Sequence, residues 1–473
     1  MESIKNLPVA IIGAGPVGLA AAAQLVRRGL KPLILESGPS AGTSLRAWGH
    51  VRLFSPWRYV VETAAAELLR STGWNAPDDD ALPTGTEIVE QYLEPLARVP
   101  ELAKNILFDA KVSAITRQGL DKVASQERDA APFQIRYTDK TGTERSVIVR
   151  AVLDASGTWS RPSPMGVDGL PVIGEKGASD KIAYGIPDVT GRDKADYAGR
   201  SVLVVGSGHS AINVVLSLLD LQATTPATKV LWALRRNRIE RLLGGGLNDQ
   251  LPARGDLGLA AKAAIENGRV KLLAPFSAQS IRTKRDALEV DALLGGQPER
   301  LAVDRIIVAT GLRPDLDMLK ELRIDVDPAV EAPRKLAPMI DPNLHSCGTV
   351  PPHGVVELIQ PEQGFFIVGG KSYGRAPTFL MATGYEQVRS VVAELAGDHK
   401  AAREVHLVLP ETGVCNVSTS PSAASSAGGC CGSPAPAMVD ACCVADVGVR
   451  EAGKSGCGCG STALKQSETA PAQ

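Results

Sequence analysis

Short apolar runs alternate with longer, alanine-rich apolar runs along most of this chain. The run Val9-Ala-Ile-Ile12 predicts a buried strand, residues 16–28 predict a helix, and residues 32–36 predict a second strand. The same order returns as a strand at 202–205, a helix at 209–220 and a strand at 229–234. Alternation of this kind is typical of β-α-β units with parallel strands.

Each unit is followed by a stretch whose pattern predicts short paired strands. Residues 111–153 predict a meander with a hairpin across residues 139–142, and residues 279–303 predict a second hairpin-like stretch. The two stretches close on the apolar runs 151–157 and 306–311, which both end in glycine. A further strand at 364–370 ends in paired glycines, and a helix is predicted at 381–395. The chain thus repeats one design.

We therefore expect an α/β fold with two Rossmann-like, three-layer dinucleotide-binding domains that carry β-meander additions. Residues 1–160 form the first part of one domain, residues 161–315 form the second domain, and residues 316–415 return to the first. Residues 416–473 contain no aromatic residue and are rich in Ala, Gly, Ser, Pro and Cys. Such a segment cannot bury enough apolar surface to offset its chain entropy, so we expect a disordered, cysteine-rich tail.

Composition narrows the class of partner. The formal net charge is −1, which predicts neither nucleic acid nor an anionic membrane as a partner. The apolar stretch 11–26 is short for a membrane span, and its three glycines and one proline fit a phosphate-binding turn better. No signal-peptide pattern precedes Val9, so we expect a cytoplasmic protein.

The first strand–helix junction carries a dinucleotide-binding fingerprint. Gly13, Gly15 and Gly18 have the spacing that such a turn needs, and Pro16 falls near the first helical position. Glu36 ends the second strand, where an acidic side chain accepts hydrogen bonds from a ribose diol. The alternative is a glycine-rich turn in an ordinary α/β domain, with Glu36 as a solvated strand end. The full pattern favours FAD.

The second junction repeats the fingerprint with the opposite charge. Gly206, Gly208 and Ala211 occupy the three fingerprint positions, and Arg235 and Arg236 follow the next strand. Arginine at that place suits the 2′-phosphate of NADPH. The alternative is an exposed basic surface.

Further segments give the chain a family resemblance. Residues 155–162, residues 309–314 and the segment Trp48-Gly-His-Val-Arg-Leu-Phe-Ser-Pro56 resemble the two-dinucleotide flavoproteins, and most of all the flavin-containing monooxygenases. The resemblance covers roughly residues 5–400 and implies an NADPH- and FAD-dependent oxidoreductase. Besides the fingerprint residues we assign to the cofactor sites Trp48, Gly157, His209, Ser210, Thr310, Gly311, Gly369 and Gly370.

The chain departs from this family at two places. The family's Phe-x-Gly-x-x-x-His sequence is missing before the second fingerprint, where Val172-Ile-Gly-Glu-Lys and Ile182-Ala-Tyr-Gly stand instead. Phe54 stands where many members carry an asparagine beside the flavin. We therefore interpret the chain as a divergent branch and do not carry over amine or ketone substrates.

A narrower resemblance points to a substrate. The segments 371–378, 383–387 and 409–415 are similar to flavoproteins found with bacterial arsenic-resistance genes, and the Cys-Cys tail is similar to tails of arsenic-detoxifying proteins. This resemblance implies oxidation of trivalent arsenicals to pentavalent forms, and thus arsenic resistance. A reduced flavin that has reacted with oxygen can form a peroxide, which donates oxygen to soft nucleophiles such as trivalent arsenic. The expected partners are a trivalent arsenical and oxygen. No catalytic side chain is assigned.

The cysteines are concentrated late in the chain. None precedes Cys347, and thiolates bind thiophilic metalloids, so all of them are candidate ligands. The alternatives are adventitious thiols, a flavin-dependent thiol/disulfide reductase that uses the tail, and a metalloid-binding protein on a flavoprotein scaffold. A homodimer stays open as the assembly. The candidate ligands are Cys347, Cys415, Cys430, Cys431, Cys442, Cys443, Cys457 and Cys459.

Overall fold

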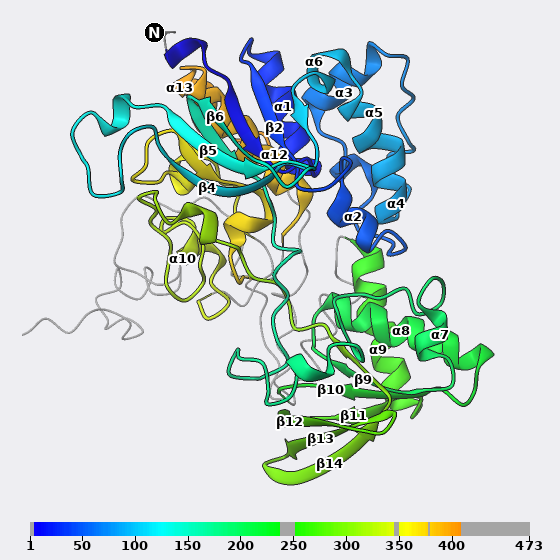
Figure 1. Cartoon of the computed structure of the whole chain (residues 1–473). Coiled ribbons are helices and arrows are strands. Elements are labelled where there is room, and N and C mark those ends of the chain that lie inside the picture. The colour runs from blue at the N-terminus through cyan, green and yellow to red at the C-terminus, as the bar shows by residue number, and fades with distance from the viewer. Residues whose placement is uncertain (1–3, 237–250, 345–349, 377–378, 408–473) are drawn as a thin grey trace, which may run out of the picture. The chain divides into compact units, whose positions relative to one another are not determined.

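A computed structural model describes residues 4–236, 251–344, 350–376 and 379–407 (Figure 1). All of these residues belong to one compact unit, Met1–Ser418. The second unit, Thr419–Gln473, lies outside the described residues. The segment predicted to be a disordered tail, residues 416–473, lies outside them as well.

The first sheet is parallel and has the strand order β16-β7-β1-β2-β3. Strands β1, β7 and β16 are buried throughout, which explains why they appear in the sequence as continuous apolar runs. The return strand β16 pairs with β7, so residues far apart in the chain share one sheet. The strands are β1 (Val9–Ile12), β2 (Pro32–Leu35), β3 (Ile106–Leu107), β7 (Ala151–Asp154) and β16 (Phe365–Ile367).

Two layers cover this sheet. Ile11 and Ile34 share a core with α1 (Pro16–Arg27), α3 (Thr63–Arg70) and α12 (Met381–Leu395). Ala10 and Ile12 point the other way and pack with Phe133 of an antiparallel meander. Alternate residues of one strand therefore serve opposite faces, as a three-layer domain requires. The meander consists of β4 (Lys111–Arg117), β5 (Phe133–Thr138) and β6 (Glu144–Val149).

The second sheet repeats the plan with the order β11-β10-β9-β15-β8, again parallel. Val202 and Val204 pack with α8 (His209–Thr224) and α9 (Pro252–Glu266), whereas Leu203 and Val205 pack with a second meander. The strands are β8 (Ile182–Tyr184), β9 (Ser201–Val205), β10 (Lys229–Ala233), β11 (Lys271–Leu273) and β15 (Arg305–Val308), with β12 (Phe276–Lys284), β13 (Ala287–Leu294) and β14 (Gln297–Val303) in the meander. The repeat confirms the α/β fold class expected from the sequence.

Short helices complete the unit. They are η1 (Ile4–Asn6), α2 (Thr43–Ala47), η2 (Trp57–Tyr59), α4 (Gly85–Ile88), the π-helix η3 (Val89–Leu93), α5 (Glu94–Ala97), α6 (Pro100–Ala103), η4 (Arg128–Ala130), η5 (Lys176–Ala178), α7 (Lys194–Tyr197), η8 (Asp317–Leu319), α10 (Ala337–Ile340), α11 (Val355–Leu358), η9 (Gly369–Tyr373) and α13 (His399–Arg403). Within the described ranges, no helix has the length and apolar character to cross a membrane.

Two segments connect the sheets and run antiparallel to each other. Ser163 N donates to Gly311 O at 2.9 Å, and Arg313 N donates to Arg161 O at 2.8 Å. The guanidinium of Arg161 also binds both carboxylate oxygens of Asp315, at 2.9 and 3.0 Å. The outgoing and returning segments are therefore held together as a two-stranded ribbon.

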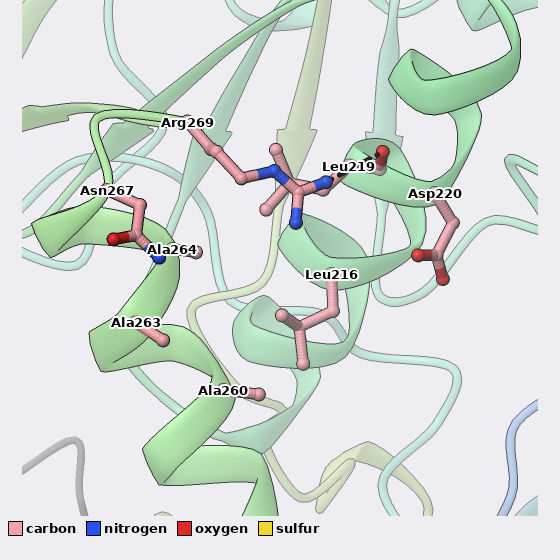
Figure 2. A pocket seen from close by; sticks show the side chains of 8 residues that line it. All are labelled: Leu216, Leu219, Asp220, Ala260, Ala263, Ala264, Asn267 and Arg269. Atoms are coloured by element: carbon pink, nitrogen blue, oxygen red, sulfur yellow. Dashed lines mark hydrogen bonds between the residues drawn. The ribbon is translucent and has the colours of Figure 1, made fainter.

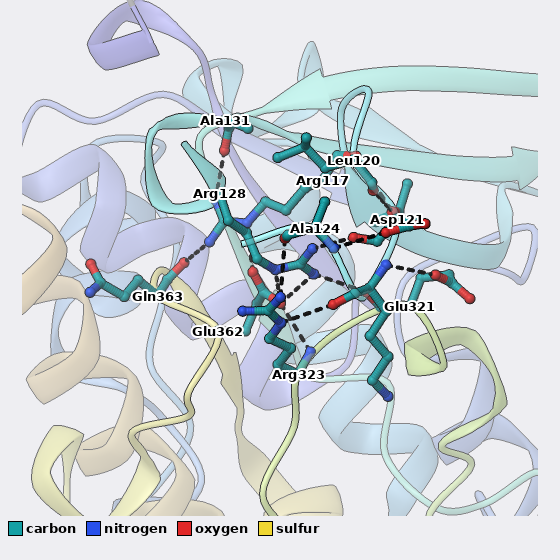
Figure 3. Close-up of polar contacts among 12 residues, drawn as sticks. Arg117, Leu120, Asp121, Ala124, Arg128, Ala131, Glu321, Arg323, Glu362 and Gln363 are labelled. Atoms are coloured by element: carbon teal, nitrogen blue, oxygen red, sulfur yellow. Dashed lines mark hydrogen bonds and ion pairs between the residues drawn. The ribbon is translucent and has the colours of Figure 1, made fainter. Parts of the chain in front are cut away.

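A buried charge cluster joins the first meander to the returning chain (Figure 3). Glu362 accepts hydrogen bonds from Arg117 Nε at 2.7 Å, Arg128 Nη2 at 2.7 Å and Arg323 N at 2.9 Å. Burial alone would raise the pKa of Glu362, but the bonds from Arg128, Arg323 and Arg117 outweigh it and lower the pKa. The cluster holds the meander against the segment that leads into β16.

Candidate functional site

The first glycine turn follows β1, and at two of its glycines the surrounding backbone leaves no room for a side chain. Gly13 has φ +102°, and a Cβ there would lie 2.9 Å from the carbonyl oxygen of Ala155. A Cβ at Gly18 would lie 2.0 Å from the carbonyl oxygen of Gly13. Gly15 differs, because a Cβ there would have no described atom within 4 Å. The turn is closely packed on its protein side and open at Gly15.

Helix α1 starts at this turn with Pro16, and Gly15 is its N-cap. Gly15 has no side chain, so the helix N-terminus is not capped by its own N-cap residue. Unpaired N–H groups and the helix dipole make such a terminus favourable for a phosphate group. The open position at Gly15 and the N-terminus of α1 thus form a surface that fits a pyrophosphate.

Glu36 follows β2 and holds the turn in place. Its Oε2 accepts a hydrogen bond from Ala14 N at 2.7 Å, and its Oε1 accepts one from Gly38 N at 2.7 Å. Only 8% of the residue is exposed. Each carboxylate oxygen can accept a second bond. The sequence predicted a contact with a ribose diol, and that contact stays a prediction.

Three further predicted residues lie along the same edge of the first sheet. Gly157 follows β7 with φ +70°, and Gly369 follows β16 with φ +69°. Gly370 comes next in η9. Because β7 lies between β1 and β16 and all three are parallel, their carboxyl ends meet at one edge.

Trp48, which was also predicted to bind the cofactor, is half-buried and packs over Gly85, where a Cβ would lie 3.1 Å from its ring.

Sequence reasoning missed a charged pair at this edge. Lys371 Nζ lies 2.6 Å from Asp154 Oδ2, and both side chains are fully buried. The available signal was an aspartate within an apolar run and a lysine directly after the paired glycines. Neither position identified the other as its partner.

The second glycine turn has the same architecture. Gly206 has φ +140°, and a Cβ there would lie 2.2 Å from the carbonyl oxygen of Ala309. A Cβ at Gly208 would have no described atom within 4 Å, and α8 starts at the next residue, His209. Ala211 is fully buried against the sheet, so its methyl group takes the place of the third glycine. Ser210 is exposed.

Two arginines and a threonine border this second turn. Arg235 and Arg236 are exposed just beyond β10, and Trp232 Nε1 of that strand donates to Gly206 O at 2.8 Å. Thr310 Oγ1 contacts the carbonyl oxygen of Ser163 at 2.9 Å, so this hydroxyl group holds the connecting ribbon. Gly311 follows with φ +101°. The predicted cofactor roles of these residues stay predictions.

A contact between Phe54 and His209, a residue of the second fingerprint, joins the two halves of the unit. The ring of Phe54 lies 5.2 Å from the ring of His209, and Arg254 Cζ lies 5.8 Å from the Phe54 ring centroid. Arg254 belongs to the first turn of α9 and is only 5% exposed. The sequence indicated Phe54 as a departure from the family pattern but gave no signal for Arg254.

His353 is part of a buried network behind Gly369. Its Nδ1 lies 3.0 Å from Pro351 O, and its Nε2 lies 2.9 Å from Gln387 Nε2. Gln387 Oε1 accepts a hydrogen bond from Gly369 N at 2.8 Å. Burial lowers the pKa of His353, although Pro351 O and two nearby carboxylates oppose the shift. A neutral ring with its proton on Nδ1 satisfies every partner in this network.

The predicted metalloid ligands are not placed by the structure. Within the residues that the structure covers, no group of histidine, cysteine and carboxylate side chains could hold a metal ion. The candidate ligands Cys347, Cys415, Cys430, Cys431, Cys442, Cys443, Cys457 and Cys459 all lie outside the described residues.

A cavity of about 240 Å³ lies between α8 and α9 (Figure 2). Leu216, Leu219 and the alanines of α9 line it, with Asp220 and Arg269 at its border. The lining residues come from the later turns of α8, from the end of α9 and from the residues just after α9, away from the turn at Gly208. The cavity is therefore separate from the nucleotide edge.

Comparison with known proteins agrees with this geometry. A family model described as pyridine nucleotide-disulphide oxidoreductase matches residues 10–347. A human protein named putative dimethylaniline monooxygenase [N-oxide-forming] 6 is 26% identical over 232 residues, which are 48% of this chain and 41% of that protein. A ferredoxin–NADP reductase of Gluconacetobacter diazotrophicus is 25% identical over 323 residues, which are 67% of this chain and 75% of that protein. The chain thus spans less than half of the human relative.

Solved structures share the fold. Bacillithiol disulfide reductase from Bacillus cereus aligns with a TM-score of 0.59 at 18% identity, over 83% of this chain and 99% of that chain. Ornithine N-hydroxylase from Kutzneria aligns with a TM-score of 0.55 at 16% identity, over the same shares. The family match and the monooxygenase relatives confirm the predicted flavoprotein oxidoreductase class, with FAD and NADPH as its cofactors.

Proposed function

Because the chain belongs to the pyridine nucleotide-disulphide oxidoreductase family, we propose that it is an NADPH-dependent FAD monooxygenase that oxidises trivalent arsenicals. The reaction consumes one NADPH, one proton and one oxygen molecule for each trivalent arsenical, and yields NADP⁺, water and the pentavalent product. Acting in the cytoplasm, this activity confers arsenic resistance. The observation that carries the proposal is the combination of two open glycine turns with the absence of cysteine from residues 1–346.

In this proposal, residues 1–160 and 316–415 hold FAD. Gly15 and the N-terminus of α1 accept the pyrophosphate, and Glu36 accepts hydrogen bonds from the ribose with the lone pairs that Ala14, Ser37 and Gly38 leave free. The turns at Gly157 and Gly369 border the same site. When bound, FAD supplies the electron transfer and the oxygen activation, for which protein side chains have no equivalent.

Residues 161–315 hold NADPH. Gly208 and the N-terminus of α8 accept its pyrophosphate, and the exposed Arg235 and Arg236 accept its 2′-phosphate. Phe54 and His209 lie in ring contact where the second turn meets the segment after α2, so they border the path between the two nucleotides.

The cysteine distribution separates this proposal from a thiol reductase. A dithiol reductase needs a redox-active cysteine pair next to its flavin, and residues 1–346 contain no cysteine. The proposal takes oxygen, rather than a disulfide, as the acceptor for the electrons of the flavin. The alternatives, a thiol/disulfide reductase that uses the tail and a metalloid-binding protein on this scaffold, predict different products.

The late cysteines suggest the substrate. Thiolates bind trivalent arsenic as soft ligands, and six cysteines lie between Cys430 and Cys459. We propose that these six bind the arsenical and deliver it to the flavin site, with Cys347 and Cys415 as further ligands.

The test follows NADPH and oxygen consumption by the purified protein with arsenite and with a methylated trivalent arsenical. The proposal expects both rates to rise with the arsenical. Replacement of the six tail cysteines by serine is expected to raise the KM for the arsenical and to leave the KM for NADPH unchanged. NADPH oxidation that needs a disulfide and proceeds without oxygen would establish the reductase instead.

A further inference from the structure

A three-residue cluster lies at the edge of the first sheet where we place FAD. Lys371 Nζ pairs with Asp154 Oδ2 at 2.6 Å and donates to Ser156 Oγ at 3.0 Å. Ser156 Oγ in turn donates to Asp154 Oδ1 at 2.7 Å. Asp154 and Lys371 have no exposed side-chain surface, whereas Ser156 is exposed. We call these residues the Asp154 cluster.

The cluster joins two turns that follow β7 and β16, the two strands on one side of β1 and its glycine turn. Asp154 is the last residue of β7, and its backbone partners are Ile12 of β1 and Ile367 of β16. Lys371 lies in η9, the turn that follows β16. One ion pair therefore connects the turn after β7 to the turn after β16. Both turns lie at the edge of the sheet where we place FAD.

The turn after β7 also packs directly on the first fingerprint. A Cβ at Gly13 would lie 2.9 Å from Ala155 O and 3.2 Å from Ser156 Cα. The open position at Gly15 is two residues further along the chain. The Asp154 cluster thus supports the fingerprint from the protein side, and its two charged members are closed off from the open side.

We propose that Lys371 is a positioning residue that sets the affinity for FAD through Asp154 and Ser156 without touching the cofactor. This inference rests on the proposed FAD site. As a pair, the ammonium and the carboxylate present little net charge to the pyrophosphate. Without the ammonium, an uncompensated carboxylate lies behind a site for an anion, in surroundings that screen charge poorly.

This role makes a prediction that a merely structural ion pair does not make. Loss of either partner breaks the pair and lowers the stability of the protein. FAD affinity, however, responds to the sign of the charge that remains. Lys371→Met leaves a negative charge behind the proposed pyrophosphate site, Asp154→Asn leaves a positive one, and the double variant leaves none.

The experiment titrates FAD-free protein with FAD and follows flavin fluorescence, while thermal unfolding of the FAD-free protein reports stability. K371M is expected to raise the Kd for FAD about tenfold or more, because the remaining carboxylate repels the pyrophosphate. D154N is expected to leave the Kd unchanged or to lower it. The double variant D154N/K371M is expected to return to within about threefold of the wild type, since the repelling charge is gone.

Arg375→Met is the matched control, because Arg375 lies just beyond η9 and pairs with Glu331 at the surface. Its Kd for FAD is expected to equal that of the wild type. Equal increases of the Kd in K371M and D154N, or a lower melting temperature with an unchanged Kd in K371M, would overturn the inference and leave the proposed function standing. A wild-type protein that binds no FAD would overturn both. If K371M does not fold, D154N and the double variant decide instead: neither is expected to raise the Kd by more than about threefold, and a rise of about tenfold in either would overturn the inference.

Discussion

The carboxylate of Glu36 accepts a hydrogen bond from the backbone N–H of Ala14 at 2.7 Å. The residue at the end of β2 therefore fixes the glycine turn at the end of β1, in addition to its predicted contact with a ribose. A residue of this kind affects a bound nucleotide in two ways, through its own contact and through the shape of the turn.

Glu36→Gln tests this double role. A glutamine carries one acceptor oxygen, so one of the two N–H groups of Ala14 and Gly38 loses its partner. We expect the free energy of unfolding to fall by about 1–3 kcal/mol, measured by urea unfolding of the FAD-free protein, together with weaker FAD binding. Glu331→Gln at the surface is the control, and an equal loss in that variant would contradict the assigned role.

Two glycines of the first turn have different predicted roles. Gly15 is expected to affect FAD binding, and Gly18 is expected to affect stability. Gly15→Ala adds a methyl group to open space, so we expect the FAD-free protein to unfold at the wild-type temperature and to bind FAD poorly. Gly18→Ala places a methyl group 2.0 Å from Gly13 O, and we expect a loss of about 1–3 kcal/mol in stability. Thermal unfolding and FAD titration measure the two effects. Normal FAD binding by G15A would show that the pyrophosphate lies elsewhere.

Much of this arrangement could be predicted from local sequence. The strand at Val9–Ile12 and the helix after it follow from an apolar run, a glycine turn and a proline at the first helical position. The second unit repeats the same local signals. Elements and glycine turns are encoded by neighbouring residues, which is why their positions were found without a structure.

The charged pairs could not be predicted in this way. Asp154 and Lys371 are 217 positions apart in the chain, and Arg117 and Glu362 are 245 apart. No local pattern tells a buried charge which distant residue will neutralise it. Such pairs form only when the return strand β16 is placed beside β7, which is a property of the whole sheet.

The arginines beyond β10 are predicted to set the choice between NADPH and NADH. Arg235→Ala with Arg236→Ala is expected to raise the KM for NADPH about tenfold or more and to leave the KM for NADH nearly unchanged, because only NADPH carries the 2′-phosphate. Steady-state kinetics with the two nucleotides measure the ratio. Equal changes for both would place the 2′-phosphate away from these residues.

His353 predicts a dependence of stability on pH. Burial lowers its pKa in the folded protein, so below about pH 6.5 the unfolded chain takes up a proton that the folded protein resists. The free energy of unfolding is therefore expected to fall as the pH drops below that value, by up to about 1.4 kcal/mol per pH unit from this group. The nearby Glu357 and Glu386 oppose the shift but do not reverse it.

His353→Gln isolates this contribution. Glutamine does not titrate and can still accept a hydrogen bond from Gln387, so the variant is expected to lose stability less steeply than the wild type between pH 6.5 and pH 5. Urea unfolding at a series of pH values gives the two slopes. Parallel curves would show that His353 is not the titrating group.

In the proposed reaction, the electrons of NADPH pass through the flavin to oxygen, and one oxygen atom reaches a trivalent arsenical. The amounts of NADPH oxidised, oxygen consumed and pentavalent arsenical formed are measured in the same reaction. Equal amounts of all three and no turnover without oxygen are expected. NADPH oxidation without oxygen uptake, or oxygen uptake that yields hydrogen peroxide and no pentavalent arsenical, would contradict it.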